Sequence, residues 1–294
     1  MKLLICGAQG QLGSVLSAVL AKGASDLGAL PSVYKDAQLV CAGADELDIT
    51  DEVKTQEFIR QGAFDLIINC AAMTQVDACE TQEAAAYQVN AVGALNVAKA
   101  AEQIGAKLVQ MSTDYVFSGD DNKEYVETDP TNPQSAYGRT KLAGERAVLE
   151  NCKTSFVVRT AWLFGATGPN FVLAILDIAR SEGEITVVND QYGNPTYAHD
   201  LAHEILRIAE GSEYGVYHCT SRGVCSWFDF ASAIVDMAGV ECIKHPCTTK
   251  QFARPAKRPA YAPLKNKRLE DTIGCTMRSW QTALAVYLEG VDTV

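Results

Sequence analysis

Three glycines close to the N-terminus constrain the fold of this chain more than any other feature of its sequence. Residues 2–6 form a short apolar run, and residues 7–13 read Gly-Ala-Gln-Gly-Gln-Leu-Gly. Between a strand and a helix, the first glycine of this spacing allows a tight turn. The second lets the backbone approach a pyrophosphate, and the third lets the helix pack on the sheet. Residues 7–13 therefore predict a dinucleotide-binding loop, with an ordinary strand-to-helix turn as the alternative.

The first 160 residues alternate between short apolar runs and helical patterns. The predicted strands are 2–6, 38–42, 65–71, 107–112 and 155–163, and the predicted helices are 11–21, 51–61, 83–104 and 135–151. This alternation is typical of a parallel sheet that has helices on both faces. We therefore predict an α/β fold of the Rossmann type, a doubly wound parallel sheet, over residues 1–160.

Beyond residue 165 the pattern becomes looser. Helices are predicted at 170–182, 199–209, 226–238 and 279–289, and a short strand at 185–188. Residues 246–263 hold four of the nine prolines and should be largely irregular. We interpret residues 161–294 as a smaller, mainly substrate-binding C-terminal lobe, from which some segments return to the sheet.

The composition of the chain excludes several classes of function. Lys and Arg number 25 against 36 Asp and Glu, so the net charge is −11 and the surface repels nucleic acid and anionic lipid on average. No run of apolar residues is long enough to span a membrane, and the N-terminal apolar run is too short for an export signal. Ten cysteines occur without a Cys-x-x-Cys pair. We expect a cytoplasmic protein with reduced thiols and no bound metal.

One segment departs from this acidic balance. Residues 242–269 contain eight Lys or Arg residues and no acid. Such a segment in an acidic protein suggests a local anionic ligand, and an exposed cationic loop is the alternative.

Three residues predict the chemistry. Tyr137 and Lys141 are four residues apart at the start of a predicted helix, so they share one face. A neighbouring ammonium lowers the pKa of a tyrosine, ordinarily about 10, so that the pair can act as acid or base near neutral pH. Thr113 directly follows the predicted strand 107–112, at the end where parallel sheets bind their ligands. We predict an oxidoreductase triad, against the alternative of a strand-end threonine and a surface Tyr/Lys pair.

The motifs of the chain resemble a known family. The glycine loop, residues 69–72 (Asn-Cys-Ala-Ala), residues 112–117 (Ser-Thr-Asp-Tyr-Val-Phe) and the Tyr/Lys pair are similar to extended short-chain dehydrogenases/reductases. Within that family, the dTDP-4-dehydrorhamnose reductases are resembled by residues 159–165 (Arg-Thr-Ala-Trp-Leu-Phe-Gly), 189–196 (Asn-Asp-Gln-Tyr-Gly-Asn-Pro-Thr) and 257–259 (Lys-Arg-Pro). The resemblance covers essentially the whole chain. It implies reduction of dTDP-4-dehydro-L-rhamnose to dTDP-L-rhamnose with NADPH or NADH.

The resemblance also implies roles for individual residues. Tyr137 would protonate the forming alkoxide, Lys141 would tune Tyr137 and hold the ribose, and Thr113 would polarise the ketone. With the glycine loop, the implied cofactor contacts are Gly7, Gly10, Gln11, Leu12, Gly13, Asp48, Ile49, Ala71, Ala72, Met73, Thr74, Tyr137 and Lys141. The implied substrate contacts are Thr113, Asp114 and Trp162. For Trp162 alone, packing in the core at the end of a strand is the alternative. Arg258 is our candidate for the substrate diphosphate, because arginine can bind phosphate through two donors.

Two positions depart from the family pattern. Gly43 stands where an acid is common at the end of the second strand, so the sequence offers no charge to choose between NADH and NADPH. Some members bind Mg²⁺ at a dimer interface through a glutamate in the first helix, but residues 13–16 read Gly-Ser-Val-Leu. We therefore expect no Mg²⁺-linked dimer, and a monomer or a weak homodimer.

Two other functions remain open on the sequence. A nucleotide-sugar epimerase or dehydratase of the same scaffold would carry an identical triad. A non-catalytic, NADP-binding regulatory subunit like the beta chain of methionine adenosyltransferase also resembles these reductases. Residues 190–196 favour the reductase over both.

Overall fold

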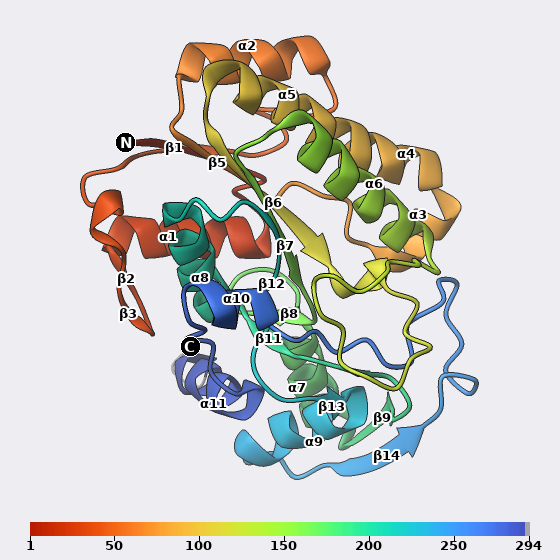
Figure 1. Ribbon diagram of the computed structural model, residues 1–294. Helices are drawn as coiled ribbons and strands as arrows, with labels where there is room; N and C mark the ends of the chain where they lie inside the picture. Colours follow the sequence, from red (N-terminus) through yellow and green to blue (C-terminus); the bar gives the residue numbers. More distant parts are fainter. Residues whose placement is uncertain (292–294) are drawn as a thin grey trace.

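A parallel sheet runs through the middle of the protein, a computed structural model that describes residues 1–291 (Figure 1). In that range its six strands stand in the order β12-β7-β6-β5-β1-β4, and neighbouring strands are parallel throughout. The strands are β1 (Lys2–Cys6), β4 (Gln38–Ala42), β5 (Leu66–Asn69), β6 (Lys107–Thr113), β7 (Ser155–Thr160) and β12 (Gly215–His218). The predicted doubly wound α/β fold is confirmed.

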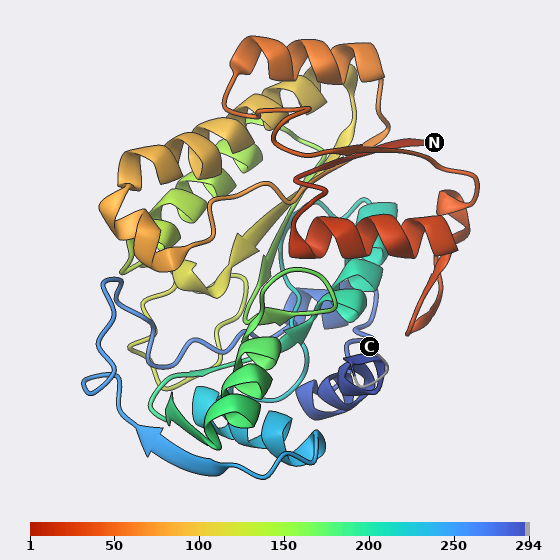
Figure 2. The ribbon, with the colours of Figure 1, turned by 180° about the vertical axis from the view of Figure 1, so that it is seen from behind.

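Alternate residues of β1 explain why both faces of the sheet are covered. Leu3 and Ile5 pack with α1 (Gln11–Lys22) and α8 (Ala198–Glu210) in one apolar cluster. Leu4 and Cys6 pack on the opposite face, in a cluster with α2 (Glu52–Gly62), α5 (Ala94–Ile104) and α6 (Ala136–Asn151). The view from behind shows the same two layers of helices (Figure 2). A strand that is buried on both sides reads as a continuous apolar run, as residues 2–6 do.

Three parts of this first region differ from the sequence prediction. The helix predicted at 83–104 consists of α4 (Glu83–Tyr87), a π-helical turn (Gln88–Gly93) and α5. A short helix, α3 (Val76–Thr81), follows the loop after β5. The long connection from α1 to β4 contains a small hairpin of β2 (Ala24–Ser25) and β3 (Gly28–Ala29), and then a single 3-10 turn (Ser32–Tyr34).

The later part of the chain surrounds a third apolar cluster. Phe164, Phe230 and Trp280 lie in this cluster, which joins α7 (Phe171–Glu182), α9 (Trp227–Met237) and α11 (Trp280–Val291). The remaining elements are short: β8 (Leu163–Phe164) with β11 (Thr196–Tyr197), β9 (Glu184–Val188) with β14 (Ile243–Cys247), β10 (Tyr192–Gly193) with β13 (Cys225–Ser226), and α10 (Lys267–Thr272). Residues 292–294 of the predicted C-terminal lobe lie outside the described residues. Within residues 1–291, no helix combines the length and the apolar character needed to cross a membrane.

Candidate active site

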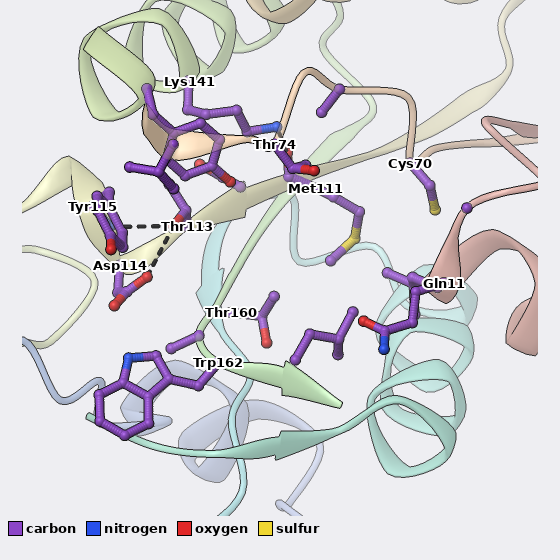
Figure 3. Close-up of a pocket in the computed structure, with 18 of the residues that line it drawn as sticks. Gln11, Cys70, Thr74, Met111, Thr113, Asp114, Tyr115, Lys141, Thr160 and Trp162 are labelled. Atoms are coloured by element: carbon purple, nitrogen blue, oxygen red, sulfur yellow. Dashed lines mark hydrogen bonds between the residues drawn. The ribbon is translucent and has the colours of Figure 1, made fainter. Parts of the chain in front are cut away.

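A cavity of about 440 Å³ opens at the carboxyl ends of the central strands (Figure 3). Gly7 follows β1, Cys70 follows β5, and Thr113 ends β6, and all three line the cavity. The strand order reverses between β1 and β5, because β4 lies on one side of β1 and the later strands lie on the other. Ligands of open α/β sheets bind at such a reversal. In Figure 3, Thr113, Asp114, Tyr115 and Trp162 lie on one side of the cavity, and Gln11 and Cys70 on the other.

The glycine loop fits tightly around this reversal. Gly7 has a φ of 71°, and a Cβ atom there would lie 2.7 Å from the backbone nitrogen of Ala71. A Cβ atom on Gly13 would collide with the carbonyl oxygen of Gly7. Gln11 follows in the first turn of α1, and its buried Nε2 finds no hydrogen-bond partner among residues 1–291. A buried donor without a partner is rare, so its position beside the loop fits a bound polar ligand such as a dinucleotide.

A second cavity, of about 310 Å³, shares Gly7, Gly10 and Ala72 with the first and continues toward β4. The predicted cofactor residues therefore divide into two groups. The first cavity is lined by Gly7, Gly10, Gln11, Leu12, Gly13, Ala72, Thr74, Tyr137 and Lys141. The second cavity adds Asp48, Ile49 and Ala71. Together the two cavities bring together the predicted cofactor residues with the exception of Met73.

Met73 is held through its backbone by a residue that the sequence analysis missed. The Asn90 side chain accepts a hydrogen bond from Met73 N–H at 2.8 Å and donates one to Met73 C=O at 3.1 Å. Asn90 also donates to the hydroxyl of Thr140 on α6. It lies in the π-helical turn, and such turns are frequent at functional sites. No local sequence pattern marks Asn90, because its partners lie 17 and 50 residues away.

The predicted triad is assembled at the cavity wall. Helix α6 begins after Ser135, whose hydroxyl accepts a hydrogen bond from Gly138 N–H at 3.1 Å, and this cap sets the first turn that carries Tyr137. The Tyr137 ring meets Tyr115 edge to face, with 5.5 Å between centroids. The Lys141 ammonium donates to the carbonyl oxygen of Met111 at 2.7 Å.

The electrostatics of the triad differ from the sequence prediction. Burial raises the pKa of Tyr137, and a hydrogen bond with Thr113 opposes this only in part. Burial lowers the pKa of Lys141 to about 8, with the Glu145 carboxylate acting in the opposite direction. Lys141, together with the positive nicotinamide, was expected to lower the pKa of Tyr137. The Lys141 ammonium is held at Met111 C=O, and desolvation of the phenol is the largest influence on the pKa of Tyr137. Tyr137 therefore stays protonated, which is the form that a proton donor needs.

Asp114 is a buried carboxyl beside the triad. It accepts a hydrogen bond from the Thr113 hydroxyl at 2.9 Å, and burial raises its pKa to about 7. The same hydroxyl accepts a hydrogen bond from Tyr115 N–H at 3.2 Å. The role of Thr113 as a donor to a ketone stays a prediction, and it requires the hydroxyl to turn away from Asp114.

Two predicted substrate residues lie in different surroundings. Trp162 lines the cavity, at a bend where its φ of 47° ends β7 before the predicted boundary. Arg258 lies outside the residues that line the cavities described here. Its guanidinium binds both carboxylate oxygens of Asp77 on α3, with Nη2 at 3.0 Å from Oδ2. The role of Arg258 toward a diphosphate stays a prediction.

Other residues of the basic segment 242–269 also have partners. Lys244 pairs with Asp236, and Lys267 pairs with Asp271. The Arg268 guanidinium donates to backbone carbonyls, including that of Tyr214 at 2.6 Å. Acids from elsewhere in the chain thus neutralise part of a segment that contains none itself.

The first cavity is also lined by residues to which the sequence analysis gave no role. These are Cys70, Val76, Met111, Ser112, Tyr115, Thr160, Ala161, Leu163 and Trp227.

A buried polar network lies behind the triad. Arg159 on β7 binds both carboxylate oxygens of Glu145, at 2.8 and 2.7 Å, and the Ser112 hydroxyl donates to Glu145 at 2.5 Å. The two charged side chains are 5% and 2% exposed. His218 lies 3.4 Å from Arg159, and burial together with that charge lowers its pKa to about 3. This network ties α6, which carries Tyr137, to the ends of β6 and β7.

Comparison with known proteins agrees with this geometry. A dTDP-4-dehydrorhamnose reductase of Mycobacterium tuberculosis (strain CDC 1551 / Oshkosh) is 41% identical over 294 residues, covering 98% of this chain and 92% of the relative. The crystal structure of a dTDP-4-dehydrorhamnose reductase from Clostridium acetobutylicum is 42% identical, with a TM-score of 0.94 over 99% of this chain and 100% of the other. The Bacillus anthracis enzyme of the same name, in complex with NADP, is 37% identical, with a TM-score of 0.91 over 98% and 99% of the two chains.

The family described as RmlD substrate binding domain matches residues 1–293. The match extends from the glycine loop through the triad to the C-terminal helix, so it spans the residues that build the cavity. The resemblance inferred from the sequence motifs is confirmed. This chain belongs to the RmlD substrate binding domain family.

Proposed function

We propose that this chain reduces dTDP-4-dehydro-L-rhamnose to dTDP-L-rhamnose, with NADPH or NADH as the source of hydride. The observation that carries the proposal is the position of the triad: Thr113, Tyr137 and Lys141 line the same cavity as the glycine loop. A family of nucleotide-sugar reductases with this arrangement needs a hydride source and a proton donor at one place. The glycine loop would bind the hydride source, and Tyr137 would be the proton donor.

The residues of the chain divide the work of the reaction. Gly7, Gly10 and Gln11 would hold the cofactor, which would supply the hydride for the C4 carbon of the ketone. Tyr137, protonated because it is buried, gives its proton to the C4 oxygen as the alkoxide forms. The Lys141 ammonium is held at Met111 C=O and is the candidate to hold the ribose hydroxyls. Thr113 and Asp114 lie next to Tyr137 and are the candidates to bind the substrate carbonyl and the hydroxyl beside it.

The test is an assay of NADH and NADPH oxidation with dTDP-4-dehydro-L-rhamnose, with the product identified by mass spectrometry. We expect stoichiometric oxidation and dTDP-L-rhamnose as product. The assay is run in EDTA, because the first turn of α1 carries no acid that would hold Mg²⁺. Interconversion of sugar nucleotides without net cofactor oxidation would indicate an epimerase or dehydratase. Cofactor binding without turnover would indicate a regulatory subunit.

We expect NADH to bind more tightly than NADPH, by no more than about tenfold or about 1.4 kcal/mol. The Glu46 carboxylate accepts a hydrogen bond from Gly43 N–H at 2.8 Å, so an acid reaches the end of β4 although none stands there in the sequence. This is the position at which dinucleotide-binding folds hold the adenosine ribose, and a 2′-phosphate would add a second negative charge. Lys54 lines the same surface hollow as Glu46 and is the cation that a 2′-phosphate could approach, but its ammonium is already paired with Asp51 at 3.1 Å.

Titration of cofactor fluorescence measures both dissociation constants. Glu46→Gln should tighten NADPH binding and leave NADH binding nearly unchanged. Tighter binding of NADPH than of NADH, a preference of more than about tenfold for NADH, or an unchanged ratio in the variant would contradict this prediction.

The proposal includes a cellular setting. We propose that residues 1–160 mainly bind the dinucleotide, that residues 161–294 mainly bind the sugar nucleotide, and that the protein works in the cytoplasm as a monomer or a weak homodimer. The ten cysteines are free thiols, and six of them are buried, such as Cys6, Cys79 and Cys219. Free thiols are expected in a reducing compartment.

A further inference from the structure

Trp162 occupies an unusual backbone conformation at the edge of the cavity (Figure 3). Its φ of 47° lies in the left-handed region, which is costly for a bulky side chain. Such strain persists only where the surroundings hold the residue in place, and it concentrates at ligand sites. The neighbours of Trp162 therefore indicate what its position is used for.

The face of the Trp162 indole is covered by a second tryptophan. The rings of Trp162 and Trp227 stack with centroids 3.6 Å apart and an angle of 8° between their planes. Phe171 packs against Trp227, with 4.4 Å between the ring centroids, and so helps to hold Trp227 in place. Both indoles line the cavity that contains the triad. The stack is thus one continuous aromatic wall rather than two separate side chains.

The Trp162 ring also packs directly against a glycine. A Cβ atom on Gly193 would lie 2.6 Å from the indole, in contact with the rigid ring rather than with a flexible chain end. The backbone around this glycine is held at several points. Thr196 N–H donates to Trp162 C=O at 3.1 Å, and the Asn194 side chain bonds Leu264 N–H at 2.7 Å. Residues 190–196 are the segment that favours the reductase over its alternatives in the sequence. In the structure, this segment contacts the ring of Trp162 and binds its backbone.

We propose that Trp227 and Gly193 are positioning residues that hold Trp162 as a preformed wall for the sugar nucleotide. The inference rests on the proposed function, because it assigns the wall to that substrate. Trp162 lies on the side of the cavity that carries Thr113 and Asp114, away from Gln11 (Figure 3). Displacing it should weaken binding of the sugar nucleotide and leave binding of the cofactor unchanged.

Gly193→Ala is the sharpest test, since one methyl group collides with the ring. We expect kcat/KM for the sugar nucleotide to fall about 10- to 100-fold, mostly through KM, because small misplacements at a site have effects of this size. The dissociation constant for NADH should stay within about twofold, as expected for a change outside the cofactor site. Gly290→Ala is the matched control, because the added methyl would meet no atom of the described residues within 4 Å.

A double-mutant cycle separates contact with the ring from other effects of the methyl group. Trp162→Ala removes the ring, so adding Gly193→Ala to it should change kcat/KM by no more than about twofold. Additive losses would overturn the inference. Trp227→Ala should raise KM as Gly193→Ala does, and Trp227→Phe, which keeps an aromatic face, should restore most of the loss.

Circular dichroism gives a readout that needs no turnover. Two indoles stacked this closely couple electronically and produce a paired positive and negative band. Gly193→Ala should weaken that signal with all three tryptophans still present, whereas a signal that persists unchanged would overturn the inference. Dissociation constants for dTDP-L-rhamnose, measured by quenching of tryptophan fluorescence, should rise in Gly193→Ala and in Trp227→Ala. If wild-type protein binds dTDP-L-rhamnose but does not oxidise NADH or NADPH, the proposed activity fails while the wall is still supported. Unchanged binding in both variants overturns the wall itself.

Discussion

Tyr137→Phe should lower kcat by about 10²- to 10⁴-fold and leave the protein folded and able to bind cofactor. The change removes one hydroxyl and keeps the ring that meets Tyr115 edge to face at 5.5 Å. Because burial keeps Tyr137 protonated, the wild-type phenol is ready to donate, and the variant must take its proton from water. Single-turnover measurement of cofactor oxidation isolates the chemical step.

A second tyrosine controls for the loss of a buried hydroxyl. Tyr217 is buried in the sheet away from the residues that line the cavity, and its hydroxyl donates to Glu213 C=O at 2.6 Å. Tyr217→Phe should lower stability slightly and keep kcat near the wild-type value. If Tyr137→Phe retains more than about a third of wild-type kcat while chemistry limits turnover, general acid catalysis by Tyr137 is wrong.

Lys141→Met should differ from Tyr137→Phe by losing cofactor affinity as well as rate. The Lys141 ammonium is the expected partner of the ribose hydroxyls, and its pKa of about 8 is low for a lysine. The charged form is present below that pH and is lost as the pH rises through it, so wild-type cofactor affinity should fall above about pH 8. Lys141→Met should bind cofactor weakly at every pH and lack this fall. A titration of the dissociation constant against pH measures both, and an unchanged constant at neutral pH would exclude Lys141 from the ribose.

The glycine loop and the triad could be predicted because their signals are local. Residues 7–13 combine a strand, three spaced glycines and a helix within a few residues, and the structure places Gly7 and Gly13 against backbone as that spacing requires. Tyr137 and Lys141 share a helical face because they are four residues apart. The alternation of apolar runs was enough to predict the doubly wound sheet.

The partners of the site could not be predicted, because they come from distant parts of the chain. Arg258 binds Asp77, which is 181 residues away in the sequence. Asp77 lies on the short helix α3, which the sequence pattern did not predict. Trp162 bends away from β7 through a left-handed conformation, although the sequence pattern predicted that the strand continues to residue 163. Trp227 reads as the first turn of an amphipathic helix, and only the fold brings its ring against Trp162. Periodicity reports which face of an element is buried and not what it is buried against.

Arg159→Met should lower the free energy of unfolding by about 3–5 kcal/mol, because it leaves the Glu145 carboxylate buried with its counter-charge removed. Arg159 supplies two of the hydrogen bonds to Glu145, and the Ser112 hydroxyl supplies a third. His218 is a poor replacement for the lost charge, because burial is the largest cause of its lowered pKa and burial remains in the variant. Urea denaturation measures the loss, provided that the dependence on urea concentration stays the same.

An exposed ion pair on the same helix is the matched control for this loss. Arg139 also binds both oxygens of a glutamate, Glu83, with both bonds at 2.9 Å, but the two side chains are 44% and 48% exposed. Arg139→Met should therefore cost no more than about 1 kcal/mol, as exposed pairs do. Replacing both buried partners, Glu145→Leu with Arg159→Met, should restore about 2 kcal/mol or more relative to Arg159→Met alone, because no unpaired charge then remains. Equal losses for Arg159→Met and Arg139→Met would show that burial does not set the strength of the pair behind the triad, and that the network does not hold α6 to the sheet.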